Sequence, residues 1–561
     1  MRYRCRLLAR LFLLVLALAC PGVSQVFQPS PLTCRVVSVP YQLRGEGITE
    51  LTGDITVTCT GGTPTPVGQP IPQANLELFL NAAVTSRILS NGSSEALLLL
   101  DEPGTPANPA QLLCVNTNGC VVAGTGGATE PFNGSLGRPN IFQGVVSGNS
   151  VTFQGVPVDP PGTTSARTYR MTNVRMNATA LTSVSAVVPV LASISATNNA
   201  LPINNAQTIV GFVQSGMTFG GGGVIALQCA PLTNPVQATL AYSENFASAF
   251  KTRTIAGADP TGAAQQNSPG VAYNSESGFI FPGPPPLGLT DYGTRFKAVL
   301  RNIPPGVSVW ASTSNLGSTA SSKAQLVASE SGPYSPIAST TNLLGYDAVA
   351  VPIVNGTATL VWEVTATQPT ALESFFFGVF FSSTNPLDIN APAATVNGSF
   401  AATGTPPAAG QPPSGPIPRF VDNSTASNVI TVLPCQTTLL FPFVTDQSGF
   451  DTGLTISNTT TDPFNTSAQT GTCTLNAYGK NAPSPVTSPS ISTATSYTVL
   501  ASTTFPNFVG YVIAVCNFQY AHGFAFISDV GARNLAAGYL SLILIGRPGQ
   551  STLTNSESLA F

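Results

Sequence analysis

The sequence predicts an all-β protein made of several antiparallel β-sandwiches, Ig-like in general architecture, with a Pro-rich linker before a C-terminal β-module. Apolar and polar residues alternate with a period of two in many short segments, and helical periodicity is scarce. The chain has 52 Gly and 48 Pro, which follow no collagen period and therefore punctuate many turns. Apolar residues make up 43% of the chain and charged residues only 8%, which favours folded cores over disorder.

Individual strands can be assigned from this alternation. Thr357–Thr367 (TATLVWEVTAT) follows an Asn-Gly turn and places Leu360 and Trp362 on one face, as expected of a half-buried strand. Phe375–Phe381 (FFFGVFF) is apolar on both faces, so it predicts a fully buried central strand. Helix candidates are few and short, and the clearest are Glu244–Arg253 and Ala532–Tyr539.

Two strand pairs are also predicted. Arg35–Leu43 and Thr52–Cys59 would pair across the turn at Gly45–Gly47. Ile141–Val146 and Ser150–Val156 would form a hairpin around a Gly-Asn turn. Many short strands joined by turns, with almost no helix, are typical of antiparallel sandwiches.

The length requires more than one domain. About 535 mature residues exceed the roughly 250–300 that one hydrophobic core supports. Thr403–Pro418 holds six prolines and no charge, so we expect an extended, semi-rigid linker there. The predicted segments are a signal peptide (1–25), an N-terminal β domain (26–195), a middle β-sandwich domain (196–402), the Pro-rich linker (403–420), the C-terminal β-module (421–547) and a flexible tail (548–561).

The first residues predict export. Four arginines precede a short apolar run, Leu11–Ala19, and small residues follow it, which is the pattern of a secretory signal peptide. The run is too short to span a bilayer, and no later segment predicts a transmembrane helix. Leu18 and Pro21 depart from a lipoprotein box, so we do not expect lipid anchoring at Cys20. The expected location is extracellular or at the cell surface, with the periplasm as an alternative.

Charge limits the partners. The chain carries 21 basic and 24 acidic residues, and the basic ones do not cluster along the sequence. Nucleic acid is therefore not an expected partner, because phosphate binding needs clustered Lys and Arg. Carbohydrate or another extracellular protein fits better. There is no C-x-x-C motif and only one His, so we assign no metal ligands, no cofactor and no cofactor-binding residues.

The cysteines predict a disulfide framework. Eight cysteines remain after the signal segment, an even number that fits an oxidising compartment but allows 105 pairings. Closeness in sequence or a shared domain predicts three pairs: Cys34–Cys59, Cys114–Cys120 and Cys473–Cys516. Cys229 and Cys435 are left over, either as an additional pair or as unpaired thiols.

Three motifs were weighed as catalytic or phosphate-binding sites, and each has a simpler explanation. Asp451-Thr452-Gly453 resembles an aspartic-protease triplet, but no second copy occurs, so a strand-entry turn is favoured. His522 lies in an aromatic stretch without a nucleophile elbow, which favours a packed or hydrogen-bonded histidine at a strand end. Gly220–Gly223 lacks the Gly-Lys-Ser/Thr of a phosphate loop and predicts a hairpin tip. No catalytic residue is assigned.

The C-terminal region carries three long motifs, at Cys435–Thr459, Gly471–Gly479 and Gly510–Leu540. They resemble a β-rich module found at the C-termini of uncharacterised secreted bacterial proteins. The resemblance covers under a quarter of the chain. It implies export and a compact β-module, and it brings no catalytic residues.

These observations favour a secreted or cell-surface, non-enzymatic protein with a structural, adhesive or ligand-binding role. Exposed aromatic residues beside polar rims would mark its binding surface, and Trp310, Tyr511 and Tyr520 are candidates. One alternative is a secreted, glycosidase-like hydrolase that uses dispersed carboxylates, and another is an outer-membrane-associated β protein. The sequence singles out no carboxylate pair among the candidates Asp291, Asp347, Glu330, Glu363 and Glu373.

Overall fold

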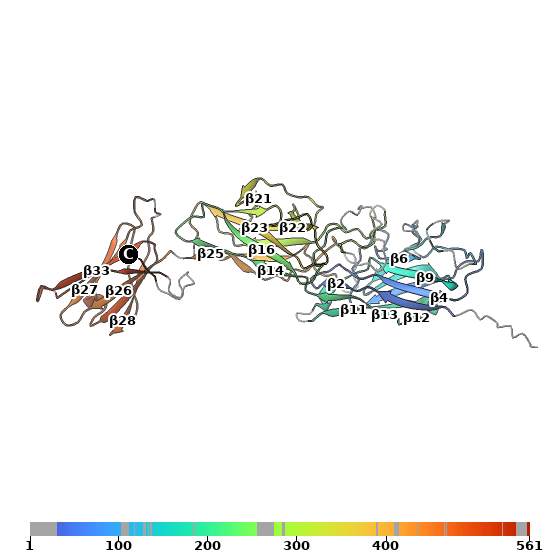
Figure 1. Cartoon of the computed structure of the whole chain (residues 1–561), viewed down its shortest axis with the longest axis horizontal. Coiled ribbons are helices and arrows are strands. Elements are labelled where there is room, and N and C mark those ends of the chain that lie inside the picture. The colour runs from blue at the N-terminus through green and yellow to red at the C-terminus, as the bar shows by residue number, and fades with distance from the viewer. Residues whose placement is uncertain are drawn as a thin grey trace, which may run out of the picture.

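The computed structural model describes residues 31–560 apart from 102–110, 117, 127–130, 133, 135–136, 183–185, 255–273, 283–285, 389–390, 409–413, 434, 465, 467, 530 and 546–557. The predicted signal peptide (1–25) lies outside the described residues. Three β-rich bodies follow one another along the longest axis (Figure 1), and the all-β prediction is confirmed. Within the described residues, no helix is long and apolar enough to cross a membrane.

The N-terminal body is built on one curled sheet. Its elements are β1 (Thr33–Ser38), β2 (Tyr41–Arg44), β3 (Glu50–Leu51), β4 (Ile55–Gly61), β5 (Gln73–Leu80), β6 (Leu97–Leu100), β7 (Ile141–Ser147), β8 (Ser150–Pro157), β9 (Gly162–Thr172), β10 (Arg175–Met176), η2 (Ala178–Leu181), β11 (Val188–Ala196), η3 (Thr197–Asn199), β12 (Ile203–Asn204) and β13 (Gln207–Gln214). Eleven strands pair in the order β12-β1-β4-β9-β6-β7-β8-β5-β11-β13-β2. Val57 of β4 and Leu78 of β5 share one core, so the two halves of the sheet enclose it.

Two details of this body differ from the sequence-based prediction. The sheet includes β11 and β13 and so extends to Gln214, which moves the domain boundary predicted at 195 toward the middle domain. The β7–β8 hairpin forms as predicted, and β1 pairs with β4. However, β2 pairs in parallel with β13 instead of with β4, because the chain changes direction between Ser38 and Tyr41.

The middle body is a sandwich of two six-stranded sheets. Its strands are β14 (Met217–Gly221), β15 (Val224–Leu227), β16 (Val236–Glu244), β17 (Arg295–Arg301), β18 (Val307–Ser312), β19 (Lys323–Leu326), β20 (Thr341–Leu343), β21 (Tyr346–Ala350), β22 (Ala358–Ala366), β23 (Ser374–Ser383), β24 (Ala394–Ala401) and β25 (Ser427–Leu433). The sheets have the orders β14-β16-β23-β18-β21-β20 and β15-β25-β24-β17-β22-β19. Rings from both sheets stack in the core, for example Trp362 on Phe377 with centroids 4.2 Å apart.

The predictions for β22 and β23 are confirmed, except that Phe376 is exposed on β23 and that Val361 and Glu363 are buried on the second face of β22. β23 is central and pairs with β16 and β18, although Phe376 remains 42% exposed. β22 buries Leu360 and Trp362 as expected, and Glu363 on the other face is buried as well. Its burial follows from an ion pair with Arg295 on the adjacent strand.

Gly220–Gly223 is a crossover and not the predicted hairpin tip. β14 lies in one sheet of the sandwich and β15 in the other, so the chain changes sheets at these glycines. A Cβ at Gly222 would lie 2.5 Å from the Thr239 carbonyl oxygen, and one at Gly221 would lie 2.1 Å from the Ser427 hydroxyl. The close approach of the two sheets explains why glycine occupies these positions.

The Pro-rich segment does not join the middle body to the C-terminal module. Phe420 is fully buried and forms a parallel β-bridge with Thr403. The Arg419 carbonyl oxygen accepts a hydrogen bond from the Ile48 N–H, at 2.8 Å. β25, which follows, belongs to the middle sandwich. The predicted linker (403–420) is therefore, in its described residues, part of the contact between the first two bodies, and the C-terminal module begins near residue 435 and not at 421.

The C-terminal module is a smaller sandwich. Its elements are β26 (Thr437–Thr445), β27 (Asp451–Asn458), β28 (Cys473–Lys480), β29 (Val486–Thr487), β30 (Ser496–Leu500), α2 (Ala501–Thr504), β31 (Val509–Cys516), β32 (Ala521–Ser528), β33 (Ala536–Leu540), β34 (Leu542–Ile545) and β35 (Ser558–Ala560). Its sheets have the orders β29-β28-β31-β26-β34-β35 and β30-β27-β32-β33. β35 pairs with β34, so the end of the predicted flexible tail (548–561) belongs to a sheet.

Neither predicted helix forms. After β16 the chain turns, and the Glu244 carboxylate accepts the Phe250 N–H at 2.7 Å. Ala536–Leu540 pairs with β32 as a strand. Both candidates are shorter than the roughly 12–15 residues that an isolated helix needs, so tertiary pairing overrides local propensity.

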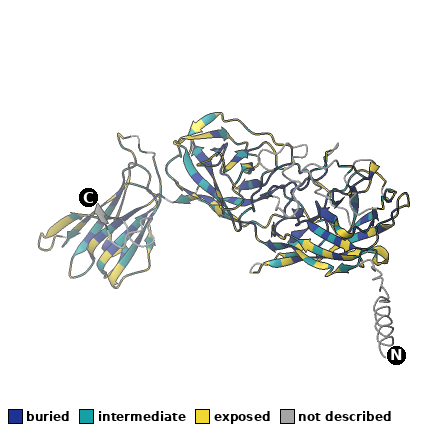
Figure 2. Cartoon of the chain, turned by 45° about the vertical axis from the view of Figure 1, so that its right-hand side comes forward, coloured by how far each residue is buried: buried dark blue, intermediate teal, exposed yellow. Residues whose placement is uncertain are grey.

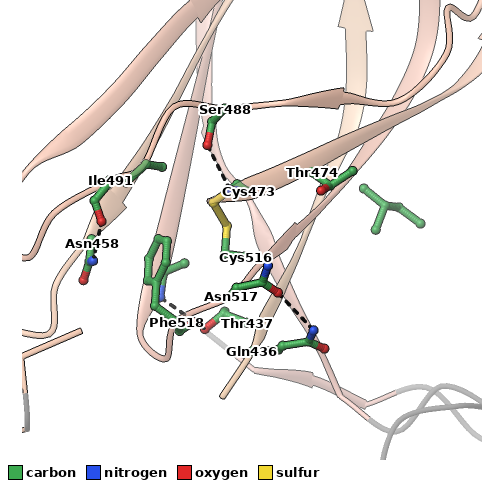
Figure 3. The surroundings of a disulfide bond; sticks show 12 residues. Gln436, Thr437, Asn458, Cys473, Thr474, Ser488, Ile491, Cys516, Asn517 and Phe518 are labelled. Atoms are coloured by element: carbon green, nitrogen blue, oxygen red, sulfur yellow. Dashed lines mark hydrogen bonds between the residues drawn. A yellow bond between two sulfur atoms is a disulfide. The ribbon is translucent and has the colours of Figure 1, made fainter. Parts of the chain in front are cut away.

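The described chain contains four disulfides. Cys34–Cys59 and Cys473–Cys516 join residues directly opposite each other on paired strands, and Figure 3 shows the Cys473 N–H donating to Ser488 beside the second bridge, at 2.9 Å. Cys114–Cys120 also forms. Cys229 pairs with Cys435 across 206 residues, so of the two alternatives left open for these residues the structure has the additional pair.

Candidate functional site

The strongest candidate site is the outer face of the four-stranded sheet of the C-terminal module. Phe524 and Phe526 of β32 project from this face and are 42% and 47% exposed. Figure 2 shows the alternation of exposed and buried positions in this end of the molecule. We call the surface the aromatic–hydroxyl face, and its members are Thr455, Ser457, Ser496, Thr498, Leu500, His522, Phe524, Phe526 and Leu540.

The alternation within β32 explains why these rings point outward. The inward positions hold small residues, Ala521, Gly523 and Ala525, all buried. A Cβ at Gly523 would lie 2.6 Å from the Phe441 ring, so the core ring needs a glycine there. With the inner face filled from β26, the larger side chains of β32 take the solvent side.

Register places hydroxyls beside the rings. Thr455 lies opposite Phe524 on one side and Thr498 on the other. The Thr455 and Thr498 hydroxyls are 3.1 Å apart, and those of Ser457 and Ser496 are 2.8 Å apart. Each hydroxyl can donate one hydrogen bond and accept two, so each keeps capacity for a ligand.

The Asp451 carboxylate, in the Asp-Thr-Gly triplet at the end of this face, is engaged in local structural contacts. The Asp451 carboxylate accepts hydrogen bonds from the Thr452 N–H at 2.8 Å and from the Ser502 N–H at 2.9 Å, and Ser502 also donates its hydroxyl. Asp451 therefore ties β27 to the first turn of α2. The strand-entry interpretation accounts for all of these contacts.

The sequence predicts a packed or hydrogen-bonded histidine at a strand end. His522 does lie near the start of β32, but its side chain is exposed and not packed. It lies on β32 opposite Ser457, at the end of the row of Phe524 and Phe526. Aromatic neighbours in the sequence indicated a core, but they share the outward face of the strand with it. The same strand pattern, AHGFAFIS, could have revealed the site had its aromatic positions been assigned to solvent.

The other predicted aromatic candidates are separate from this face. Tyr511 lies on the opposite sheet and stacks on Tyr478, with centroids 5.2 Å apart. Tyr520 is 51% exposed in the turn before β32. Trp310 lies half-buried on β18 of the middle body. The structure does not bring these three together.

The carboxylates considered for a hydrolase are engaged in structural contacts. Their partners are Arg87 and the Ile417 N–H for Asp291, Lys297 and Thr403 for Glu330, Asn342 for Asp347, Arg295 and the Gly293 N–H for Glu363, and Thr367 and the Gln368 N–H for Glu373. These contacts hold four of the five carboxylates in place as parts of the fold, whereas Asp347 is exposed and makes, among the described residues, only a 3.5 Å contact with Asn342. Among the described residues, no group of three or more His, Cys, Asp or Glu could hold a metal ion.

The Glu244 carboxylate, which lies near Glu373, has a raised pKa. Burial raises the pKa of Glu244 to about 7, and the nearby Glu373 charge adds to the shift. Its two oxygens accept the backbone N–H groups of Phe250 and Glu373. A glycosidase acid would face a cleft, whereas this carboxylate closes a turn beside β23.

A buried ion cluster lies where the first two bodies meet, and no local sequence pattern indicates it. The Arg44 guanidinium donates to Glu50 at 2.7 Å and to Glu276 at 2.8 Å, and it lies 4.6 Å from the centre of the Phe420 ring. Burial alone would lower the pKa of Arg44, but the charges of Glu276 and Glu50 outweigh it and raise that pKa. Lys251 is buried beside them, and its pKa is lowered by burial and by Arg44. Because these residues come from both bodies, the cluster joins them.

Comparison with known proteins identifies no family. No family model and no curated protein matches the chain. Solved structures that resemble it include the C-terminal domain of the AgI/II polypeptide BspA of Streptococcus agalactiae (10% identity, 66% of this chain and 96% of that one, TM-score 0.22). They also include the T6 backbone pilin of Streptococcus pyogenes (8% identity, 91% of this chain and 80% of that one, TM-score 0.18). A third is the CupB6 tip adhesin of Pseudomonas aeruginosa (8% identity, 72% of this chain and 98% of that one, TM-score 0.14). TM-scores this low carry no argument, so function is argued from the site.

Proposed function

We propose that this protein is an extracellular, non-enzymatic adhesive protein that binds neutral saccharide chains through the aromatic–hydroxyl face of its C-terminal module. The carrying observation is the side-by-side placement of Phe524 and Phe526 with the hydroxyl pairs Thr455–Thr498 and Ser457–Ser496. An exposed apolar patch with a polar rim is the usual mark of a recognition surface.

The chemistry of the face fits a sugar. A pyranose ring has C–H faces that pack on an aromatic ring and hydroxyls that exchange hydrogen bonds with Ser and Thr. The nine members of the face include no Asp, Glu, Lys or Arg. The carboxylate at its end, Asp451, already accepts hydrogen bonds from Thr452 and Ser502.

The rest of the chain fits the same proposal as a support for this module. The buried contacts of Arg44 hold the first two bodies together. The carboxylates that a hydrolase would need are engaged in ion pairs and turns. A scaffold of this kind presents a surface and leaves chemistry to other proteins.

A glycan array probed with the purified mature chain tests the proposal. We expect binding to neutral glycans, and loss of at least tenfold in apparent affinity in the F524A/F526A variant. The matched control is Y478A/Y511A, which removes two exposed, stacked rings from the opposite sheet of the same module. Its binding should equal that of the parent chain.

Two results would refute the proposal. One is equal loss in the control, which would indicate damage to the module and not to the face. The other is an unchanged array together with loss of self-association by F524A/F526A in sedimentation velocity, which would assign the face to contact between copies of the chain.

A further inference from the structure

A second hollow lies where the N-terminal and middle bodies meet, far from the aromatic–hydroxyl face. Arg87, Arg253, Asp291 and Tyr334 line a cavity of about 490 Å³. Arg87 also borders an adjoining cavity of about 250 Å³ that reaches Arg419. We call the two together the arginine hollow. Its size lies in the range of small-molecule sites.

Arg419 is the decisive residue. Its side chain is only 7% exposed, and its Nε atom is buried without a hydrogen-bond partner among the described residues. Its backbone is well fixed, since its N–H donates to the Thr49 hydroxyl at 3.0 Å. A buried cation without an acceptor is costly, and a bound anion removes that cost. Burial correspondingly lowers the pKa of Arg419.

The charge balance of the hollow is positive. Arg87 shares its charge with Asp291 at 2.9 Å. Arg253 donates through Nε to the Thr290 carbonyl oxygen at 2.8 Å, a neutral partner that leaves its charge uncompensated. Among the described residues that line the hollow there are therefore three arginines and one carboxylate, in a chain that is acidic overall.

Its remaining lining suits a hydroxylated ligand. Ser331 and Ser414 contribute to the walls, and Tyr334 is 45% exposed and offers a ring face and a phenol. Guanidinium groups match a carboxylate with paired, parallel hydrogen bonds. An acid group fixed by arginines beside a ring and hydroxyls is the pattern expected for an acidic sugar.

We propose that the arginine hollow binds an acidic saccharide through its carboxylate, with Arg419 and Arg253 as the anion ligands and Tyr334 against the sugar ring. The site is distinct from the aromatic–hydroxyl face, which lies in another body and carries no cation. It goes beyond the proposed function, because it adds a second sugar site that prefers an anionic saccharide, whereas the face binds neutral ones.

Calorimetric titration of the mature chain with D-glucuronate, D-glucose and inorganic phosphate tests this proposal. We expect glucuronate to bind, glucose not to bind, and phosphate to bind at least tenfold more weakly than glucuronate. R253Q should weaken glucuronate binding at least tenfold. R301Q is the matched control, because Arg301 is an exposed arginine of the same body bonded to Asn397, and it should bind like the parent chain.

Because Arg419 is buried, R419Q can disturb folding, so R253Q and Y334A, at less buried positions, decide the outcome, and Y334A should also weaken glucuronate binding. Equal affinity for phosphate and glucuronate would refute the saccharide assignment, and an unchanged R253Q would refute the site. F524A/F526A should leave glucuronate binding unchanged. That result separates failure here from failure of the proposed function.

Discussion

Replacing Arg44 by methionine should uncouple the N-terminal body from the middle body. The guanidinium makes six hydrogen bonds, which reach Glu50, Glu276, Thr294 and the Ala249 carbonyl oxygen. Methionine preserves much of the apolar stem but leaves two buried carboxylates without their main counterion. Breaking a buried pair costs about 3–5 kcal/mol.

Lys251 sets where in that range the loss should fall. Its buried ammonium interacts with both carboxylates, so it offsets part of the missing charge. We therefore expect a loss near the lower end, about 3 kcal/mol in the free energy of unfolding of the first two bodies. The double variant R44M/E276Q, which leaves the Glu50 carboxylate with the Lys251 ammonium, should recover part of this loss.

Urea unfolding of the mature chain, followed by tryptophan fluorescence and by far-UV circular dichroism, measures the effect. The C-terminal module supplies an internal control, because its transition should keep its midpoint in R44M. R301Q, an exposed arginine variant, should be neutral within about 0.5 kcal/mol. A loss below about 1 kcal/mol in R44M would contradict the reasoning, since it would mean that the cluster is solvated.

Two further predictions concern the middle body. The folded-state pKa of Glu244, about 7, lies above its ordinary value of 4.5, so the folded chain binds the extra proton, and the stability present below pH 4.5 should fall as pH rises through 7. Melting temperatures between pH 5 and pH 8 measure this fall, and a fall of equal size in E244Q would contradict it. Replacing both Cys229 and Cys435 by serine should cost about 5 kcal/mol of middle-body stability by the chain-entropy estimate for a loop of 206 residues, measured by urea unfolding, and an unchanged midpoint would show that this bridge constrains neither state.

Much of the fold could be predicted because a strand is indicated by residues that are close together in the sequence. β7, β8, β22 and β23 follow from alternation and turn residues within a dozen positions. Domain boundaries depended on long-range pairing, and composition could not supply it. Proline content predicted an inter-domain linker at Thr403–Pro418, but β25 returns after it to pair with β24 in the middle sandwich.

The two candidate sites were harder to predict from the sequence than the strands, for a physical reason. Outward aromatic residues such as Phe524 and Phe526 alternate along the sequence in the same way as inward ones. Alternation therefore separates the two faces of β32 but does not show which face is exposed to solvent. The arginine hollow has no local signal at all. Arg87, Arg253 and Arg419 are separated by more than 160 residues each and meet only when two bodies pack together.

The Cys229–Cys435 bridge gives the chain a mechanical shortcut. When the two ends of the molecule are pulled apart, tension entering from the C-terminal module reaches Cys435 and crosses the sulfur–sulfur bond to Cys229. The 206-residue segment between the two cysteines lies outside this covalent path and carries no tension along its backbone. Of the middle sandwich, only the edge strands β14 and β15 bear the load, and the rest keeps its shape under traction that would otherwise unravel it.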